Sequence, residues 1–154
     1  MSTHTAGTDA RPDTSSAAEG GRPGTGLSQL LQELVERTGA EQGVVLGRDG
    51  LYRARSAALD QVAAERSAAA LHSIWSMADR AGHYAGRGEA ETITVRCAGG
   101  LLALAPITPE AAVALVLGPN ASLANAGYAL IGFTEEAAAH VTNTRPAPSL
   151  AGVA

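Results

Sequence analysis

Few side chains of this sequence could carry out chemistry by themselves, and the most reactive of them is a lone cysteine. Cys97 is the only Cys among 154 residues, so an intrachain disulfide and a Cys-rich zinc site are both excluded. A single thiol could serve redox chemistry. It lies in an alternating segment at a position expected to face inward, however, and we interpret it as a small buried hydrophobe.

The histidines and carboxylates predict neither a metal site nor a catalytic pair. His4 lies near the start of the sequence, and positions 72 and 83, both His, are about three helical turns apart, too far to share one ion. Asp79 and Glu89 are interpreted as solvated charges. The sequence also lacks a Gly-x-Ser-x-Gly nucleophile elbow. We therefore expect no metal, no cofactor, no catalytic residue and no enzyme activity.

The charged residues exclude several classes of protein. All 11 basic residues are Arg. A P-loop needs a Lys for the phosphates and Schiff-base chemistry also needs a Lys, so the chain is neither type of enzyme. The Gly-rich run at residues 20–26 follows no predicted strand, and we interpret it as a linker. With 15 acidic residues against 11 basic ones, we expect no nucleic-acid partner.

Three arginines are candidates for contact with a partner protein. Arg53, Arg55 and Arg66 could together form a partner-facing cluster. An arginine can also act in trans on the phosphates bound to a GTPase, although most surface arginines are merely solvated.

Trp75 is the only Trp of the chain. It could pack in the core of a single chain, but Trp is also enriched at the centres of protein interfaces. The apolar face of its helix is too broad to be buried on one side alone, which favours an interface. The predicted dimer interface combines one face of this helix with the polar face of a later strand: Leu71, Ile74, Trp75, Ala78, Thr92, Thr94 and Arg96.

Local periodicity predicts the elements that must position these residues. Helical spacing of apolar residues alternates with strand-length apolar runs, and Asp49-Gly50 predicts a tight turn. Thr25, Asp60 and Ser122 are candidate helix caps, and Gly39 suits the position past a helix end. In chain order we expect a helix from Leu27, a hairpin over 44–55, a helix over 60–84, strands over 91–97, 101–105 and 113–117, and a helix after Ser122.

These elements predict an α/β (α+β) fold of order α-β-β-α-β-β-β-α. We expect one five-stranded antiparallel sheet with helices on both faces, because the strands near Leu101 and Val113 are apolar on both sides. A close approach to the sheet would explain Gly127 in the last helix. Residues 26–142 are predicted to form the domain. Residues 1–25 and 143–154 are predicted to be disordered tails.

The strand over 91–97 alternates, with Ile93, Val95 and Cys97 expected inward and the polar residues on the other face. Alternation predicts a position at or near the edge of the sheet. An open edge exposes unpaired backbone groups, and pairing with a second copy would remove that edge from both chains. The sequence therefore predicts a homodimer.

The chain shows neither a signal peptide nor an apolar stretch long enough to cross a bilayer. With one Cys, it fits a reducing environment. We therefore expect a cytoplasmic protein with no direct membrane insertion.

The element order and three segments resemble the Roadblock/dynein light chain family. The segments are the opening helix from Leu27 to Val35, the hairpin over 40–51 and the turn Gly99-Gly100. More narrowly, the chain resembles bacterial members encoded in conservon-type operons. The resemblance implies a homodimer, a Ras-like small GTPase as partner, and association with a membrane protein similar to a histidine kinase. The chain departs from the family in the alanines of its second helix, Ala63, Ala64, Ala68, Ala69 and Ala70.

Two other functions remain open at this stage. A small-ligand sensor of PAS-like or GAF-like type would need a pocket behind the sheet, usually with aromatic residues, and the core residues here are small and aliphatic. A purely structural interaction module would need no ligand at all. The preferred prediction is a non-catalytic dimeric scaffold or regulator of a small GTPase.

Overall fold

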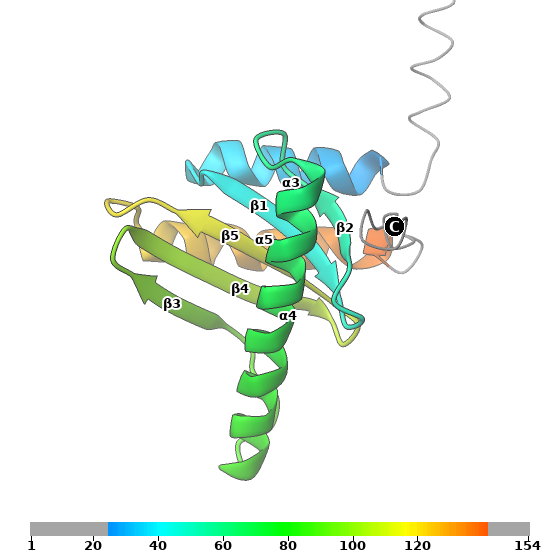
Figure 1. The fold of residues 1–154 in the computed structure, drawn as a ribbon, viewed down its shortest axis with the longest axis vertical. Helices are drawn as coiled ribbons and strands as arrows, with labels where there is room; N and C mark the ends of the chain where they lie inside the picture. Colours follow the sequence, from blue (N-terminus) through cyan, green and yellow to red (C-terminus); the bar gives the residue numbers. More distant parts are fainter. Residues whose placement is uncertain (1–24, 142–154) are drawn as a thin grey trace, which may run out of the picture.

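The computed structural model describes residues 25–141. The predicted tails lie outside this range except for Thr25, which is the first residue of a helix. The order of the elements confirms the predicted α-β-β-α-β-β-β-α arrangement (Figure 1). In chain order they are α3 (Thr25–Thr38), β1 (Gln42–Gly47), β2 (Tyr52–Arg55), α4 (Gln61–Tyr84), β3 (Ile93–Cys97), β4 (Gly100–Thr108), β5 (Ala111–Leu117) and α5 (Leu123–Val141).

The five strands form one antiparallel sheet of order β2-β1-β5-β4-β3. Strand β5 lies at the centre, where both faces of a strand are covered, and its residues are buried except for the half-buried Val116. Strand β3 lies at one edge, as the alternation over residues 91–97 predicted, and β2 lies at the other.

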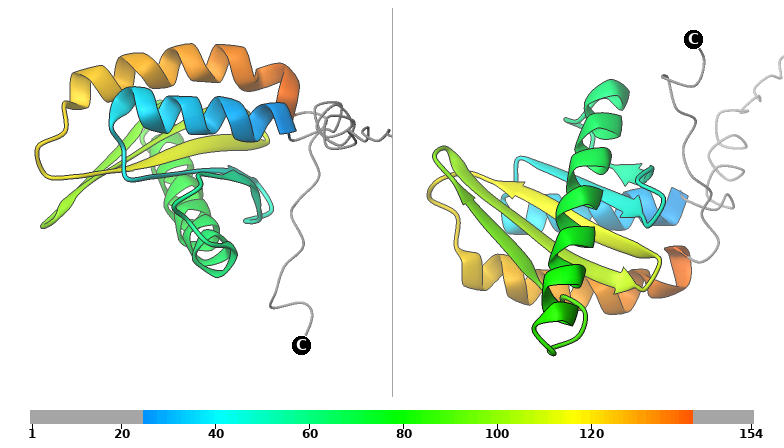
Figure 2. Two further views of the ribbon diagram at one scale, coloured as in Figure 1. Left: turned by 90° about the horizontal axis from the view of Figure 1, so that it is seen from above. Right: turned by 60° about the horizontal axis from the view of Figure 1, so that its bottom comes forward.

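Helices cover both faces of the sheet, as expected. Helices α3 and α5 lie side by side on one face, while α4 crosses the other face alone (Figure 2). Each face has its own apolar core. The two largest fully buried side chains are divided between them: Phe133 of α5 lies in one core and Trp75 of α4 in the other. Large rings thus supply buried area that the many alanines cannot.

The ends of the helices confirm most of the local predictions. The side chain of Asp60 accepts a hydrogen bond from Ala63 N–H at the start of α4, and Ser122 accepts one from Asn125 N–H before α5. Gly39 has a φ of 72° just after α3, which only glycine adopts at little cost. The side chain of Thr25 lies outside the described part of the chain.

Two local expectations were wrong. Simple alternation along the predicted hairpin would place Tyr52 and Ala54 on one face. A bulge where β2 pairs with β1 instead puts Tyr52 in the core under α4 and Ala54 in the opposite core. An extra residue in one strand shifts every later side chain to the other face. Gly127 does not mark a close approach to the sheet, because a Cβ there would meet no atom within 4 Å.

Candidate functional site

Helix α4 is divided into a packed half and a free half. Its buried residues, Ala64, Ala68, Leu71 and Trp75, follow helical spacing and lie on one stripe. The helix packs on β1 and β2, and its C-terminal half extends past the sheet (Figure 1). In that half Met77 and Tyr84 are 67% and 80% exposed. Trp75 is buried on the opposite side of the same half, so by the free half we mean its exposed face, with Met77 and Tyr84. This face presents large apolar side chains that the described residues do not cover.

The four predicted interface residues of α4 fall into two pairs. Trp75 has no exposed area and Leu71 has 6%, whereas Ile74 and Ala78 are half-buried. A side chain already covered by its own chain has almost no surface left to bury against a partner. The interpretation of Trp75 as a dimer anchor is therefore corrected to a core residue, and the interface on α4 stays a prediction for Ile74 and Ala78.

The edge strand β3 carries the other predicted interface residues. Thr94 and Arg96 are exposed on it, and Thr92 is exposed just before it. Strand β3 pairs with β4 on one side only, so its outer side presents unpaired backbone groups. Cys97 is exposed at its end, which corrects the expected burial. The reason is that the two strands α4 packs on, β1 and β2, lie at the other side of the sheet.

Half-buried apolar residues line the same face of the sheet beside α4. Register places Val95 of β3, Leu102 of β4 and Val116 of β5 in one row across three strands. Ile93 lies in the neighbouring row on the same face. All four are half-buried. We call these residues, Ile93, Val95, Leu102 and Val116, the β3-side patch. It is apolar surface that the described part of the chain leaves half-covered, and such surface suits a protein partner.

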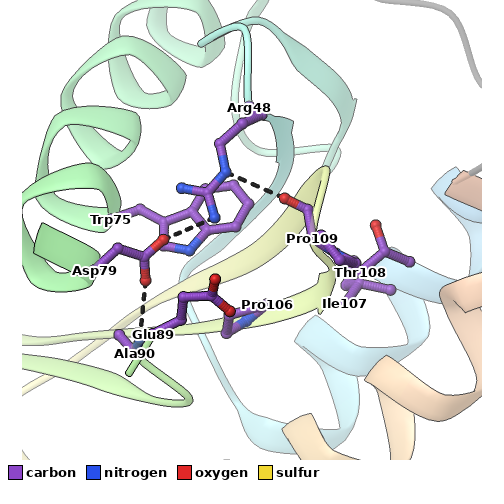
Figure 3. A pocket seen from close by; sticks show the side chains of 9 residues that line it. All are labelled: Arg48, Trp75, Asp79, Glu89, Ala90, Pro106, Ile107, Thr108 and Pro109. Carbon is purple, nitrogen blue, oxygen red and sulfur yellow. Dashed lines mark hydrogen bonds and ion pairs between the residues drawn. The ribbon is translucent and has the colours of Figure 1, made fainter. Parts of the chain in front are cut away.

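A charged cluster closes the space between α4 and the loop that leads to β3 (Figure 3). The guanidinium of Arg48 lies over the Trp75 ring, 3.6 Å from its centre. It donates from Nη2 to Asp79 Oδ2 at 2.8 Å and from Nε to the carbonyl of Pro109 at 3.1 Å. The other oxygen of Asp79 accepts from Ala90 N–H at 2.8 Å. Asp79 was interpreted as a solvated charge, and this interpretation is wrong.

These contacts explain how α4 is tied to two loops. Stacking of a guanidinium on an indole contributes about 0.5–2 kcal/mol. Asp79 bonds to both Arg48 and Ala90, so one carboxylate joins the β1–β2 turn to the segment before β3. Arg48 and Asp79 lie 31 residues apart in the chain. The spacing of residues in the sequence could not have predicted this pair, because helical and strand periodicity relates only residues that are close together in the chain.

A pocket of about 170 Å³ opens beside this cluster. Its lining residues, all drawn in Figure 3, are Arg48, Trp75, Asp79, Glu89, Ala90, Pro106, Ile107, Thr108 and Pro109. The indole nitrogen of Trp75 is buried and has no hydrogen-bond partner among residues 25–141. An unsatisfied buried donor costs about 1–3 kcal/mol, and this nitrogen is one that the described part of the chain leaves unpaired.

The three predicted partner-binding arginines do different things in the structure. Arg53 donates to both carboxylate oxygens of Asp49, at 3.0 and 3.2 Å, and to the carbonyl of Leu51. Arg55 donates to the carbonyl of Leu59 at 2.7 Å. Arg66 is exposed on α4. Two of the three guanidinium groups therefore hold their own chain together, and their role in partner binding stays a prediction.

The arginine at position 53 also changes the acidity of its partner. Burial alone would raise the pKa of the Asp49 carboxyl, but the hydrogen bond from Arg53, the N–H of Leu51 and the positive charge of Arg53 outweigh it. The pKa of Asp49 is therefore lowered below its ordinary value of 3.8. The charged form is stabilised in the fold, which strengthens the turn between β1 and β2.

Two searches of the described residues bear on other functions. Within residues 25–141, no three His, Cys, Asp or Glu side chains come together in a way that could hold a metal ion. In the same range, no helix is long and apolar enough to cross a bilayer.

Comparisons with known proteins give a family and a fold. The family model of the Roadblock/LC7 domain matches residues 27–117. The chain is similar to a Roadblock/LC7 domain from Streptomyces avermitilis, with a TM-score of 0.70, 23% identity, and coverage of 75% of this chain and 97% of that one. No match was found among curated proteins.

Two solved structures of MglB are also similar to this chain. One is described as MglB with tetrameric arrangement, with a TM-score of 0.73, 18% identity, and coverage of 79% of this chain and 92% of that one. The other is the gliding protein MglB of Thermus thermophilus, with a TM-score of 0.72, 18% identity, and coverage of 79% and 93%. At these identities the likeness concerns the fold alone.

Proposed function

Because the chain belongs to the Roadblock/LC7 domain family, we propose that it is a non-catalytic scaffold or regulator that acts as a homodimer on a Ras-like small GTPase. The observation that carries this proposal is the presence of exposed apolar side chains on α4, Met77 and Tyr84, and of the half-buried β3-side patch on the face of the sheet that α4 crosses. A surface of this kind suits binding to proteins. It offers no nucleophile with an adjacent base, which acyl-transfer chemistry would require.

The dimer is supported by the geometry of β3. An edge strand with five residues, of which Ile93, Thr94 and Val95 are good strand formers, is a template for a further strand. Antiparallel pairing about a two-fold axis at Val95 would place Arg96 opposite Thr94 of the second copy, so that the two positive charges do not face each other. The β3-side patches of the two copies would then lie next to each other on the same face of the joined sheet, on the side that both α4 helices cross.

The GTPase partner is supported by the family to which the chain belongs. The resemblance of the sequence to conservon-type Roadblock proteins implies a Ras-like GTPase. We propose that this GTPase, and through it a membrane protein similar to a histidine kinase, are the partners of the dimer in the cytoplasm.

Two measurements test this function. Light scattering of the full chain at micromolar concentration is expected to give the mass of a dimer, and a monomer mass would contradict the dimer. Binding of the Ras-like GTPase encoded nearby should then be measured by biolayer interferometry, with the GTPase loaded with GDP or with a non-hydrolysable GTP analogue. We expect binding in at least one state. A stable dimer that binds neither form would favour a small-ligand sensor or a purely structural module.

A further inference from the structure

Helices α3 and α5 lie side by side on one face of the sheet, but their outer sides differ (Figure 2). The outer side of α3 is polar, with the exposed residues Ser28, Gln29, Glu33, Glu36 and Arg37. The outer side of α5 instead presents Tyr128 and Ile131, which are 84% and 61% exposed. Residues three positions apart are neighbours on a helix surface, so these two side chains form one apolar surface that α3 lacks.

The exposed residues around this pair recur at intervals of three and four, as in the seam between two packed helices. We call them the α5 stripe: Ala124, Tyr128, Ile131, Gly132, Glu135 and Ala139. A Cβ at Gly132 would meet no atom within 4 Å. Glycine destabilises a helix relative to alanine, and packing among residues 25–141 does not require it at this position.

We propose that the α5 stripe binds the α5 stripe of a second copy of this chain. This contact is separate from the proposed dimer through β3 and does not rest on the proposed GTPase partner. The two helices run antiparallel about a two-fold axis that passes between Ile131 and Gly132. The axis places Ile131 of one copy opposite Gly132 of the other. The outer pairs are Ala124 with Ala139 and Tyr128 with Glu135.

Each of these pairs is complementary in size or in chemistry. The large side chain of Ile131 meets a residue without a side chain, Gly132. Ala124 and Ala139 are both small, so the two helices can approach closely at either end of the contact. The phenol of Tyr128 is a donor and the carboxylate of Glu135 is an acceptor. A contact about a two-fold axis requires such self-complementarity, because the same residues supply both sides.

Charge favours the antiparallel direction. Parallel helices in register would place Glu135 of one copy directly against Glu135 of the other. In the antiparallel arrangement each Glu135 faces Tyr128, seven residues away from the other Glu135. That separation is about 10 Å along the helix axis, which is close to the distance over which salt screens charges. The arrangement therefore avoids repulsion between like charges.

The contact is expected to be weak. One pair of helices buries less than the about 1,200 Å² that stable protein interfaces need. A dimer formed through β3 carries two α5 stripes, because α5 lies on one face of the sheet and β3 at its edge. Contacts through α5 would therefore link such dimers into larger assemblies when the protein is concentrated.

Sedimentation of the full chain between about 1 and 500 μM tests the contact, and species larger than a dimer are expected above about 100 μM. Ile131→Asp should weaken this second step at least ten-fold, or about that, and leave the dimer through β3 intact. Gln29→Asp is the matched control, since it adds the same charge to an exposed position of α3, and it should change neither step.

Two results would overturn the proposal: no growth beyond the first association step with concentration, or growth that persists in Ile131→Asp. The α5 contact and the β3 dimer can fail separately. If β3 does not form a dimer, wild-type protein should still associate through α5, and Ile131→Asp should still remove that association.

Disulfide cross-linking tests the direction of the helices. Cys97→Ser removes the only native thiol, and Ala124→Cys and Ala139→Cys are then made separately in that background. A mixture of the two variants at about 200 μM should form a disulfide between copies under mild oxidation. Each variant alone should not, because the two equivalent positions lie about 22 Å apart along the antiparallel pair.

The cross-linking outcomes separate the second copy from other occupants of the stripe. A disulfide in either variant alone would indicate parallel helices or another register and would overturn the proposal. No disulfide in the mixture would also overturn it, and would favour coverage of the α5 stripe by a different protein or by a segment of this chain outside residues 25–141.

Discussion

The sheet ends in two edge strands, β2 and β3, which the chain surrounds in different ways. Strand β2 has four residues and a bulge, and both α3 and α4 pack against it. The segment after it is held by Gln32 of α3, whose side-chain oxygen accepts from Ala57 N–H. Strand β3 has five residues without a bulge, exposed polar side chains, and a half-buried apolar patch beside it.

The difference teaches that the described part of a single chain protects one edge of the sheet and leaves the other edge open. A short, bulged edge covered by helices cannot accept another strand readily, whereas a regular, open edge can. The position of α4 determines which edge is covered. It packs over the β2 side of the sheet and leaves the apolar residues on the β3 side half-buried.

The largest effect is expected at Trp75, in the core between α4 and the sheet. Trp75→Ala should lower the free energy of unfolding by about 3–5 kcal/mol, since it removes the largest fully buried side chain and leaves a cavity. Urea denaturation followed by circular dichroism measures this change. A variant that keeps its stability but loses the dimer would instead restore Trp75 as an interface residue.

A smaller but more selective effect is expected at the open edge. Val95→Asp places a charge in the β3-side patch and should weaken dimerisation by about 3 kcal/mol, or about a hundred-fold in Kd. Sedimentation at several concentrations measures the dissociation constant. The matched control is Ile131→Asp, a similar change at a residue of α5 that is 61% exposed. Equal weakening by both variants would argue against β3 as the interface.

The cluster of Arg48, Asp79 and Ala90, which ties α4 to two loops, should contribute less to the free energy of unfolding. Asp79→Ala removes the ion pair with Arg48 and the acceptor for Ala90 N–H, and should cost about 1–2 kcal/mol of unfolding free energy. Asp79→Asn keeps an acceptor and should cost about half as much. Thermal or urea unfolding distinguishes the two variants. No loss in either would mean that the segment before β3 is held by other contacts.

The smallest effect concerns the turn that precedes the closed edge β2. Because the folded pKa of Asp49 is lowered, its charged form contributes stability above the unfolded value of 3.8, and this contribution is lost as pH falls through the folded pKa. The carboxylate is partly exposed, so we expect only a few tenths of a kcal/mol. Asp49→Asn should flatten the stability curve below about pH 4 relative to wild type. An identical pH dependence in both proteins would contradict this role of Asp49.

Local patterns in the sequence were enough for the element order, the edge position of β3, and the caps at Asp60 and Ser122. Each depends on residues within one turn or one strand, where periodicity and capping chemistry act. The site was less predictable. The exposure of Thr94 and Arg96 followed from alternation, but the burial of Trp75 and the pairing of Arg48 with Asp79 did not.

The sequence by itself thus determined which segments are helices and strands, that no Lys is present for P-loop chemistry, and which strand lies at an edge. Only the tertiary structure decided that α4 lies over β1 and β2, and this one placement buries Trp75 and leaves Cys97 exposed. The reason is physical. Periodicity states which side of an element is apolar, whereas the packing of distant segments decides which neighbour covers it.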